Sequence, residues 1–221
     1  MKTTLRNFTL TELLVIITII CLLAGFLLPA LTQTLDRAKL AFCSNNLRNI
    51  GCSVLMYCQD NSGEIPNILS GMEQSSIPVL RLPGNTVLAL GRLMGVYIDN
   101  ADIFGCPDSP GCREEDVRKL WDSTNMVWSA YLYRGKCNGF SSRLYNIENM
   151  HKPYIMDFAC ITNQGEQFAP HNYLAVNILF PDCHTETRRN TKTPFKLFTA
   201  QAALHGEITP DCTRLWERAD K

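Results

Sequence analysis

Three residues in the last quarter of the chain have side chains that can bind metals or exchange protons. They are His171, Asp182 and His184, and imidazole and carboxylate groups serve widely in metal ligation and acid–base catalysis. No nucleophile motif, glycine-rich phosphate loop or His-Glu-x-x-His motif accompanies them. The structural alternative is that Asp182 caps a tight turn and the histidines hydrogen-bond locally. We favour that alternative and expect no enzymatic activity, no metal and no cofactor. An exported hydrolase that uses these three residues is the least favoured alternative.

Cysteine is the second residue type that could do chemistry. The chain has 10 cysteines: Cys21, Cys43, Cys52, Cys58, Cys106, Cys112, Cys137, Cys160, Cys183 and Cys212. Cys21 lies in an apolar run, and an odd remainder leaves at least one thiol free, paired between chains or bound to another group. No two close pairs have zinc-finger spacing. If the domain is exported, we predict at least one disulfide, with Cys106 and Cys112 paired with each other or with Cys43. Buried free thiols are the alternative.

A single carboxylate, Glu12, lies near the start of the only long apolar run. The following 19 residues, Leu13–Leu31, carry no charge. A helix of that length spans about 28 Å, enough to cross the core of a bilayer. A carboxylate in such a segment costs at least a few kcal/mol unless it is paired. One hypothesis is that the chain is cut between Asn7 and Phe8, and that Glu12 pairs with the new Phe8 amine of a neighbouring chain.

Chain length and charge limit the number of domains, the class of partner and the orientation in a membrane. A chain of 221 residues suits one modest domain and an anchor. A formal net charge of +0 gives no electrostatic reason to expect a nucleic-acid partner. Lys2 and Arg6 precede the apolar run, so the positive-inside rule places the N-terminus in the cytoplasm and the bulk of the chain outside it.

The segment FTLTELL, residues 8–14, resembles the type IV prepilin signal, and residues 1–7 resemble its short basic leader. The resemblance implies that a prepilin peptidase cuts between Asn7 and Phe8 and methylates the Phe8 amine. It also implies that Glu12 recruits and aligns subunits. Asn7 occupies the position where the family has Gly. Because Gly has no side chain to obstruct an enzyme that works close to the backbone, we expect cleavage with reduced efficiency.

Two further segments resemble bacterial pseudopilin-like proteins that have a prepilin-type cleavage/methylation domain. The matches after the apolar run are Cys43, Asn46-Leu47, Ile50-Gly51, Tyr57 and Asp60-Asn61-Ser62-Gly63. The second segment, His171 to His184, resembles the family's signature of a His, nine residues and Asp-Gly-His. Here ten residues separate His171 from Asp182, and Cys183 replaces the Gly. We therefore expect an altered hairpin turn.

The spacing of apolar residues predicts the helices and strands that position these residues. Residues 8–60 predict one helix, with a transmembrane part (8–31) and an amphipathic stalk (32–60) that ends at Asp60-Asn61-Ser62-Gly63. Its apolar stripe is Leu40, Cys43, Leu47, Ile50, Val54 and Tyr57. Residues 61–221 predict an exported α+β domain. Its predicted helices are at 85–98 and 192–205, with a loop at 106–111. Its predicted strands are at 127–133, 153–158 and 175–180, and a strand at 183–188 returns against the last of these. The predicted fold is α+β and pilin-like, with the helix packed on a small antiparallel sheet.

These resemblances imply a pilin-like or pseudopilin structural subunit. Such a protein crosses the bacterial inner membrane once, with its N-terminus in the cytoplasm and its C-terminal domain in the periplasm. Its partners are the prepilin peptidase and other pilin or pseudopilin subunits, assembled into a filament or a type II secretion-like pseudopilus. The alternative is a monomeric, membrane-anchored binding protein that uses the prepilin signal and never polymerises.

Overall fold

Helix α1 (Leu10–Asp60) is the longest element of the structure. The computed structural model describes residues 9–68, 77–109, 111–135, 140–146, 149–157, 171, 175–189, 216 and 219–220. The chain divides into two units, Met1–Ala38 and Lys39–Lys221, and α1 contributes to both. The helix ends as predicted, because Gly63 adopts a φ of +84° and its N–H donates to the Cys58 carbonyl. The predicted leader residues 1–7 and Phe8 lie outside the described residues.

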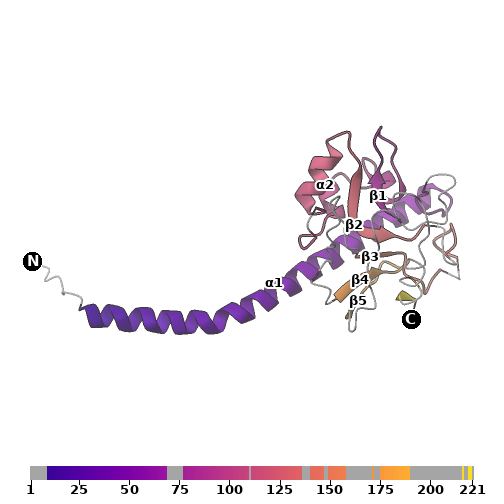
Figure 1. Ribbon diagram of the computed structural model, residues 1–221. Helices are drawn as coiled ribbons and strands as arrows, with labels where there is room; N and C mark the ends of the chain where they lie inside the picture. Colours follow the sequence, from indigo (N-terminus) through magenta and orange to yellow (C-terminus); the bar gives the residue numbers. More distant parts are fainter. Residues whose placement is uncertain are drawn as a thin grey trace, which may run out of the picture. The chain divides into compact units, whose positions relative to one another are not determined.

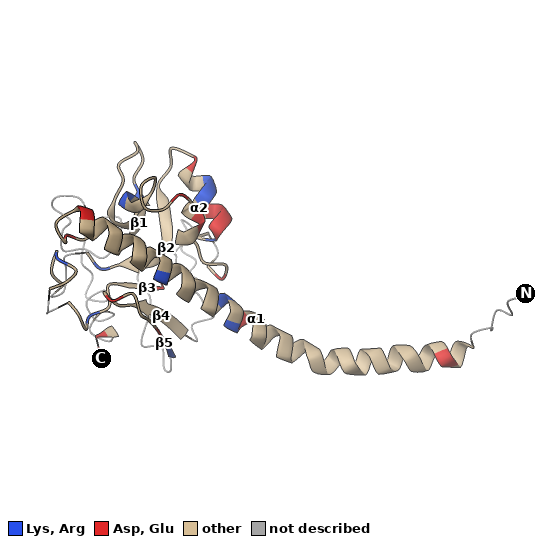
Figure 2. Ribbon diagram, turned by 180° about the vertical axis from the view of Figure 1, so that it is seen from behind, with Lys and Arg blue, Asp and Glu red and all other residues tan. Residues whose placement is uncertain are grey.

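Within the first unit, the segment Leu13–Leu31 of α1 carries no charged residue and is predominantly apolar on all sides. Every side chain of Leu13–Leu31 is exposed in the isolated chain, and Pro29 lies inside the helix. Figure 2 shows no charged residue on α1 between Glu12 and Asp36. Within the described residues, α1 is the one helix that is long and apolar enough to cross a membrane. An exposed apolar surface of this length is unfavourable in water, so it requires lipid or protein around it.

The part of α1 in the second unit carries the predicted apolar stripe. Cys43, Leu47, Ile50 and Val54 have no exposed surface, whereas Leu40 and Tyr57 are half-buried. The helix lies close to the sheet at Gly51, where an added Cβ would be 3.0 Å from a methyl group of Leu179. The stripe therefore forms part of the core of this unit, as the periodicity predicts.

A five-stranded antiparallel sheet forms another part of this core (Figure 1). Its strands, in spatial and chain order, are β1 (Ile77–Arg81), β2 (Val127–Tyr133), β3 (Ile155–Asp157), β4 (Ala175–Leu179) and β5 (Thr185–Arg189). Tyr131 of β2 pairs with Asp157 of β3, and Ile155 of β3 pairs with Leu179 of β4. The predicted α+β layout and the strand at 127–133 are confirmed, and the other three predicted strands are present with slightly different ends. Strand β1 was not predicted.

The predicted helix at residues 85–98 is wrong. The structure has a five-residue 3-10 helix there, η1 (Ala89–Leu93). Asn85 and Gly95 adopt positive φ angles, so a helix cannot pass through them. Gly91 also lies so close to strand β1 that an added Cβ would be 2.1 Å from the Leu80 carbonyl oxygen.

Two short helices follow that the sequence patterns did not predict. They are the 3-10 helix η2 (Ala101–Phe104) and α2 (Glu114–Trp121). Helix α2 has one buried residue, Val117, so it lacks a broad apolar face. Its first turn is capped, because the Arg113 N–H donates to the Asp116 carboxylate at 3.2 Å. The predicted helix at 192–205 lies outside the described residues.

Candidate functional site

Two cysteine sulfur atoms lie in contact in the core of the second unit. Cys43 comes from α1 and Cys106 from the loop after η2, and their Sγ atoms are 2.9 Å apart. The Nε2 atom of His171 lies 4.0 Å from the Cys106 sulfur. The three potential ligand atoms all lie within 4.8 Å of one another, and all three residues are buried. We call Cys43, Cys106, His171 and the adjacent Asp157 the Cys–His cluster.

The loop that holds Cys106 is closed by its own backbone. The Cys106 N–H donates to the Cys112 carbonyl at 2.9 Å, and the Cys112 N–H donates to the Ser109 carbonyl at 3.1 Å. Gly105, which precedes the loop, is pressed against α2, since an added Cβ would be 2.5 Å from the Glu114 nitrogen. These constraints place Cys106 beside α1.

His171 is positioned between two carboxylates. Its Nε2 atom is 3.2 Å from Asp157 Oδ2, and its Nδ1 atom is 3.8 Å from Asp108 Oδ2. Asp108 in turn lies 2.7 Å from the Lys39 ammonium group. The Asn177 N–H donates to Asp157 Oδ2 at 2.9 Å and orients that carboxylate. With His171 protonated, the charges alternate along Asp157, His171, Asp108 and Lys39 and sum to zero.

The pKa values reflect this arrangement. Burial alone would lower the pKa of His171, but hydrogen bonds to Asp157 and Cys106 and the charges of both raise it to about 10. The hydrogen bond from Cys43 and, to a smaller extent, the hydrogen bond and charge of His171 together lower the pKa of Cys106 to about 7 against the effect of burial. The hydrogen bond to Cys106 and burial raise the pKa of Cys43. Cys106 is therefore the more acidic thiol of the pair.

Within the part of the chain that the structure describes, several buried polar atoms around the cluster have no hydrogen-bond partner. They are Asp108 Oδ2, Ser109 Oγ, Asp157 Oδ1 and His171 Nδ1. Unsatisfied polar atoms are rare in protein interiors, and where they gather they often mark a site with chemistry. Two thiols, an imidazole and a carboxylate permit three kinds of chemistry here: a disulfide, a bound metal ion or a reactive thiolate.

The other two residues predicted to accompany His171 lie in a different environment. Asp182 and His184 are exposed at the turn between β4 and β5. The Asp182 carboxylate accepts the His184 N–H at 3.1 Å and also pairs with the imidazole Nδ1. The His184 ring stacks on Phe180 with a centroid distance of 4.3 Å. His171 is buried with the cysteines instead, so the described structure does not join the three residues into one site.

Cys183 occupies the left-handed position of the same turn. Its φ is +65°, a conformation that favours glycine, and glycine is the residue of the resembling signature. The Cys183 sulfur lies against α1, 3.2 Å from where a Cβ on Gly51 would be. The hairpin thus keeps a turn that needs a positive φ although the residue is not glycine.

The start of α1 holds the second set of predicted residues. The Glu12 carboxylate accepts the Thr9 N–H at 2.9 Å and the Thr9 hydroxyl at 2.7 Å. The Glu12 N–H donates to the Thr9 hydroxyl oxygen at 3.3 Å. This is a reciprocal capping box, which satisfies two donors at the helix end. Within one chain, Glu12 therefore already has a local partner. Asn7 lies outside the described residues.

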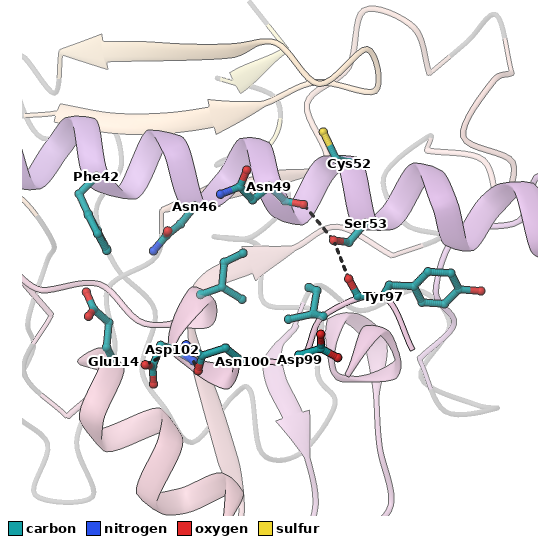
Figure 3. A pocket seen from close by; sticks show the side chains of 12 residues that line it. Phe42, Asn46, Asn49, Cys52, Ser53, Tyr97, Asp99, Asn100, Asp102 and Glu114 are labelled. Atoms are coloured by element: carbon teal, nitrogen blue, oxygen red, sulfur yellow. Dashed lines mark hydrogen bonds between the residues drawn. The ribbon is translucent and has the colours of Figure 1, made fainter. Parts of the chain in front are cut away.

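A groove of about 600 Å³ lies between α1 and the segment that contains η2. Figure 3 shows Phe42, Asn46 and Ser53 of α1 along one wall, with Asp102 and Glu114 opposite. Most of these polar groups are already engaged. Ser53 donates to the Asn49 carbonyl, Asn46 to the Gly105 carbonyl, and Asp102 pairs with Arg118. These bonds explain the polar residues of the groove as parts of the fold.

Sequence reasoning missed the residues that surround His171. Asp157 ends a strand of apolar residues, and Asn177 interrupts another, Ala175–Leu179. A charged or amide side chain in such a run is a signal of a buried polar interaction, because an unpaired group there is costly. Asp108 lies in a loop between Cys106 and Cys112, where a carboxylate gives no such signal.

Comparison of the chain with protein-family models, curated proteins and solved structures finds no match. The functional interpretation therefore depends on the residues and contacts described above.

Proposed function

We propose that this protein is a pilin-like or pseudopilin-like structural subunit. The observation that carries the proposal is the composition of α1. One helix combines a charge-free, fully exposed apolar part with a part that forms the core of a small antiparallel α+β domain. A subunit that is stored in a membrane and assembled through its first helix needs both parts. The resemblance of residues 8–14 to the prepilin signal supports the same interpretation.

In this proposal the chain crosses the bacterial inner membrane once. Lys2 and Arg6 keep the N-terminus in the cytoplasm, and the α+β domain lies in the periplasm. The prepilin peptidase removes residues 1–7 and methylates Phe8. The mature subunits then associate through their apolar helices into a filament or a type II secretion-like pseudopilus.

Glu12 has two roles in this scheme, one in each state of the chain. Before assembly its carboxylate is held by Thr9, which reduces the cost of keeping a charge near the apolar segment. During assembly the Phe8 amine of a neighbouring subunit is its partner. Exchange of a local hydrogen bond for an ion pair between chains would fix the stagger between subunits.

The alternative function is a monomeric, membrane-anchored binding protein. The groove in Figure 3 favours it, since it is the kind of concave surface that a ligand needs. The hydrogen bonds and ion pair already formed by its lining weaken this alternative. An exported hydrolase is disfavoured further, because His171 is buried with the cysteines and Asp182 and His184 are exposed.

The decisive experiment is the mass of the N-terminus followed by crosslinking in membranes. The full-length chain is expressed with and without a prepilin peptidase, purified in detergent and digested. We expect a peptide that begins with N-methyl-Phe8 only when the peptidase is present, and crosslinked multimers in those membranes. A methylated chain that stays monomeric would support the anchored binding protein. A full-length chain without methylation would contradict both.

A further inference from the structure

We propose that Cys43 and Cys106 form a disulfide that ties α1 to the loop after η2, and that His171 makes Cys106 the thiol that reacts first. The proposal rests on the proposed function in one respect. It requires that the domain be exported to a compartment where thiols are oxidised.

The geometry favours a Cys43–Cys106 disulfide over the Cys106–Cys112 disulfide that was also expected. The sulfur atoms of Cys43 and Cys106 are already in contact at 2.9 Å, and 63 positions of sequence separate them. A Cys106–Cys112 bond would close a loop that backbone hydrogen bonds already close. The bond to Cys43 instead joins two elements whose described contacts are packing and side-chain hydrogen bonds, so it adds a covalent constraint between them.

The charges around the cluster agree with the two neutral sulfur atoms of a disulfide. Asp157, His171, Asp108 and Lys39 already balance, so the cluster needs no added cation. A metal ion would require both sulfurs as thiolates. Two thiolates on one tetrahedral zinc ion lie about 3.8 Å apart, from Zn–S bonds of about 2.3 Å, so Cys43 and Cys106 would have to separate. A disulfide needs the opposite movement, to about 2.05 Å, and leaves the His171–Asp157 pair in place.

His171 determines which of the two thiols attacks the oxidant first. The imidazolium beside Cys106 favours its thiolate, whereas Cys43 stays protonated. Because Cys106 is buried, the loop after η2 first moves away from α1, and the Cys106 thiolate then attacks a disulfide of a thiol oxidant, such as oxidised glutathione or an exported dithiol oxidase. A mixed disulfide forms, and one thiolate of the oxidant leaves with a proton from solvent. The Cys43 sulfur then loses its proton, attacks the Cys106 sulfur and expels the second thiolate of the oxidant, which takes up that proton. Two thiols are oxidised and one disulfide is reduced.

Such a bond would suit a subunit whose first helix carries the assembly. Force along a filament acts on the membrane part of α1, and the described contacts between α1 and its domain are noncovalent. A covalent bond at Cys43 would prevent the stalk helix from being pulled out of the sheet domain.

The bond is tested on the full-length protein in detergent. Reduced protein is oxidised with glutathione disulfide, remaining thiols are blocked with a maleimide, and the digest is mapped by mass spectrometry. We expect a linked pair of peptides that contain Cys43 and Cys106. Cys43→Ser and Cys106→Ser should each abolish it, and the matched variant Cys112→Ser should keep it. A Cys106–Cys112 link, or zinc bound with both Cys43 and Cys106 reduced, would overturn the proposal.

The role of His171 is tested by the rate of the same reaction and its dependence on pH. In His171→Asn the pKa of Cys106 should rise. At pH 7 the loss of thiolate exceeds the gain in nucleophilicity, so linkage should be about two- to sixfold slower. The midpoint of the rate–pH curve should move to higher pH, a shift that a purely structural role would not cause. A thermal unfolding curve confirms that the variant is folded. An unchanged rate and midpoint would show that His171 does not select Cys106.

The redox state in cells separates this proposal from the function on which it rests. Trapping thiols in intact cells reports whether the domain meets an oxidant. Linkage with glutathione disulfide in detergent but reduced cysteines in cells would contradict export and leave the geometry of the pair supported. No Cys43–Cys106 linkage in detergent, in a chain that is methylated at Phe8, would contradict the disulfide and leave the pilin-like function standing.

Discussion

At the scale of single residues, His171 shows how burial and charge combine. An imidazolium in the core is stable here because Asp157 and Asp108 flank both ring nitrogens. The sequence pattern linked His171 to Asp182 and His184, yet the carboxylates that hold it come from β3 and from the loop after η2. The side chain is therefore a part of the core, and its protonation state affects stability.

The first prediction concerns this protonation. The folded pKa of His171, about 10, lies above its ordinary value of about 6.5, so the proton stabilises the fold. This contribution is fully present below pH 6.5 and is lost as the pH rises through 10. The free energy of unfolding should fall across that window in the parent and much less in His171→Asn. Denaturant unfolding of the full chain in detergent, followed by tryptophan fluorescence, measures the difference between the two curves. Parallel curves would contradict a raised pKa.

The second prediction separates the two roles of Glu12. Glu12→Gln keeps an oxygen that can accept the Thr9 N–H but removes the charge, whereas Glu12→Leu removes both. If the carboxylate pairs with a neighbouring Phe8 amine, both variants should insert normally. Each should give at least about tenfold fewer crosslinked multimers, which corresponds to about 1.4 kcal/mol per contact. Thr9→Ala is the control that removes the two hydrogen bonds of the Thr9 hydroxyl and keeps the Glu12 charge and the backbone N–H that it accepts. Parental multimers in Glu12→Gln but not in Glu12→Leu would identify capping as the role that matters.

At the scale of elements, the short 3-10 helix η1 shows why a predicted helix did not form. Residues 85–98 have adequate apolar content for a helix, but Gly91 lies directly against the backbone of β1. The close approach lets the Leu80 carbonyl accept the Leu88 N–H at 2.8 Å. A continuous helix would move Gly91 away from this contact, so the tertiary contact overrides the local pattern.

The third prediction follows from this close approach. Gly91→Ala would place a methyl group 2.1 Å from the Leu80 carbonyl oxygen, where backbone must move. We expect a loss of about 1–3 kcal/mol in the free energy of unfolding, the usual cost of overpacking. Gly25→Ala is the matched control, because nothing lies within 4 Å of its added Cβ. Denaturant unfolding of both full-length variants in detergent gives the comparison. Equal stability of the two would show that β1 and η1 are not in close contact.

A second feature at this scale is the connection between β2 and the C-terminal residues. Arg134, which follows β2, is buried and forms two hydrogen bonds with Asp220, at 2.7 and 3.2 Å. Its guanidinium also lies 5.0 Å from the centre of the Trp216 ring. A lysine has neither the planar fork nor the stacking surface for these contacts. The end of the chain is thus held to the sheet by geometry specific to arginine.

At the scale of the whole molecule, the fourth prediction concerns processing. Asn7 precedes the expected cleavage site, where a side chain obstructs an enzyme that works close to the backbone. With a prepilin peptidase present, Asn7→Gly should increase the fraction of processed chain by at least severalfold. Gel mobility and the mass of the N-terminal peptide report the fraction. Asn7→Ser is the control, because it changes the side chain without giving the backbone the conformational freedom of glycine. If Asn7→Gly stays full-length and unmethylated, residues 8–14 are not a prepilin signal.

The sequence by itself determined the helix and most of the sheet. The end of α1 at Asp60, its buried stripe and the strand Val127–Tyr133 were predictable, because each depends on residue types and spacing along a continuous segment. The uncharged run after Glu12 likewise identified a helix able to cross a membrane. Such features can be predicted without knowing which segments pack against one another.

Only the tertiary structure decided the composition of the Cys–His cluster. Its members come from α1, the loop after η2, the end of β3 and His171, four segments far apart in the chain. From the sequence, Cys43 and Cys106 were two of several possible disulfide partners, and His171 was grouped with Asp182 and His184, from which the structure places it in a different environment. Periodicity determines which face of an element is buried, but the packing of elements determines which buried side chains meet. A cluster drawn from four segments is therefore a property of the packed fold.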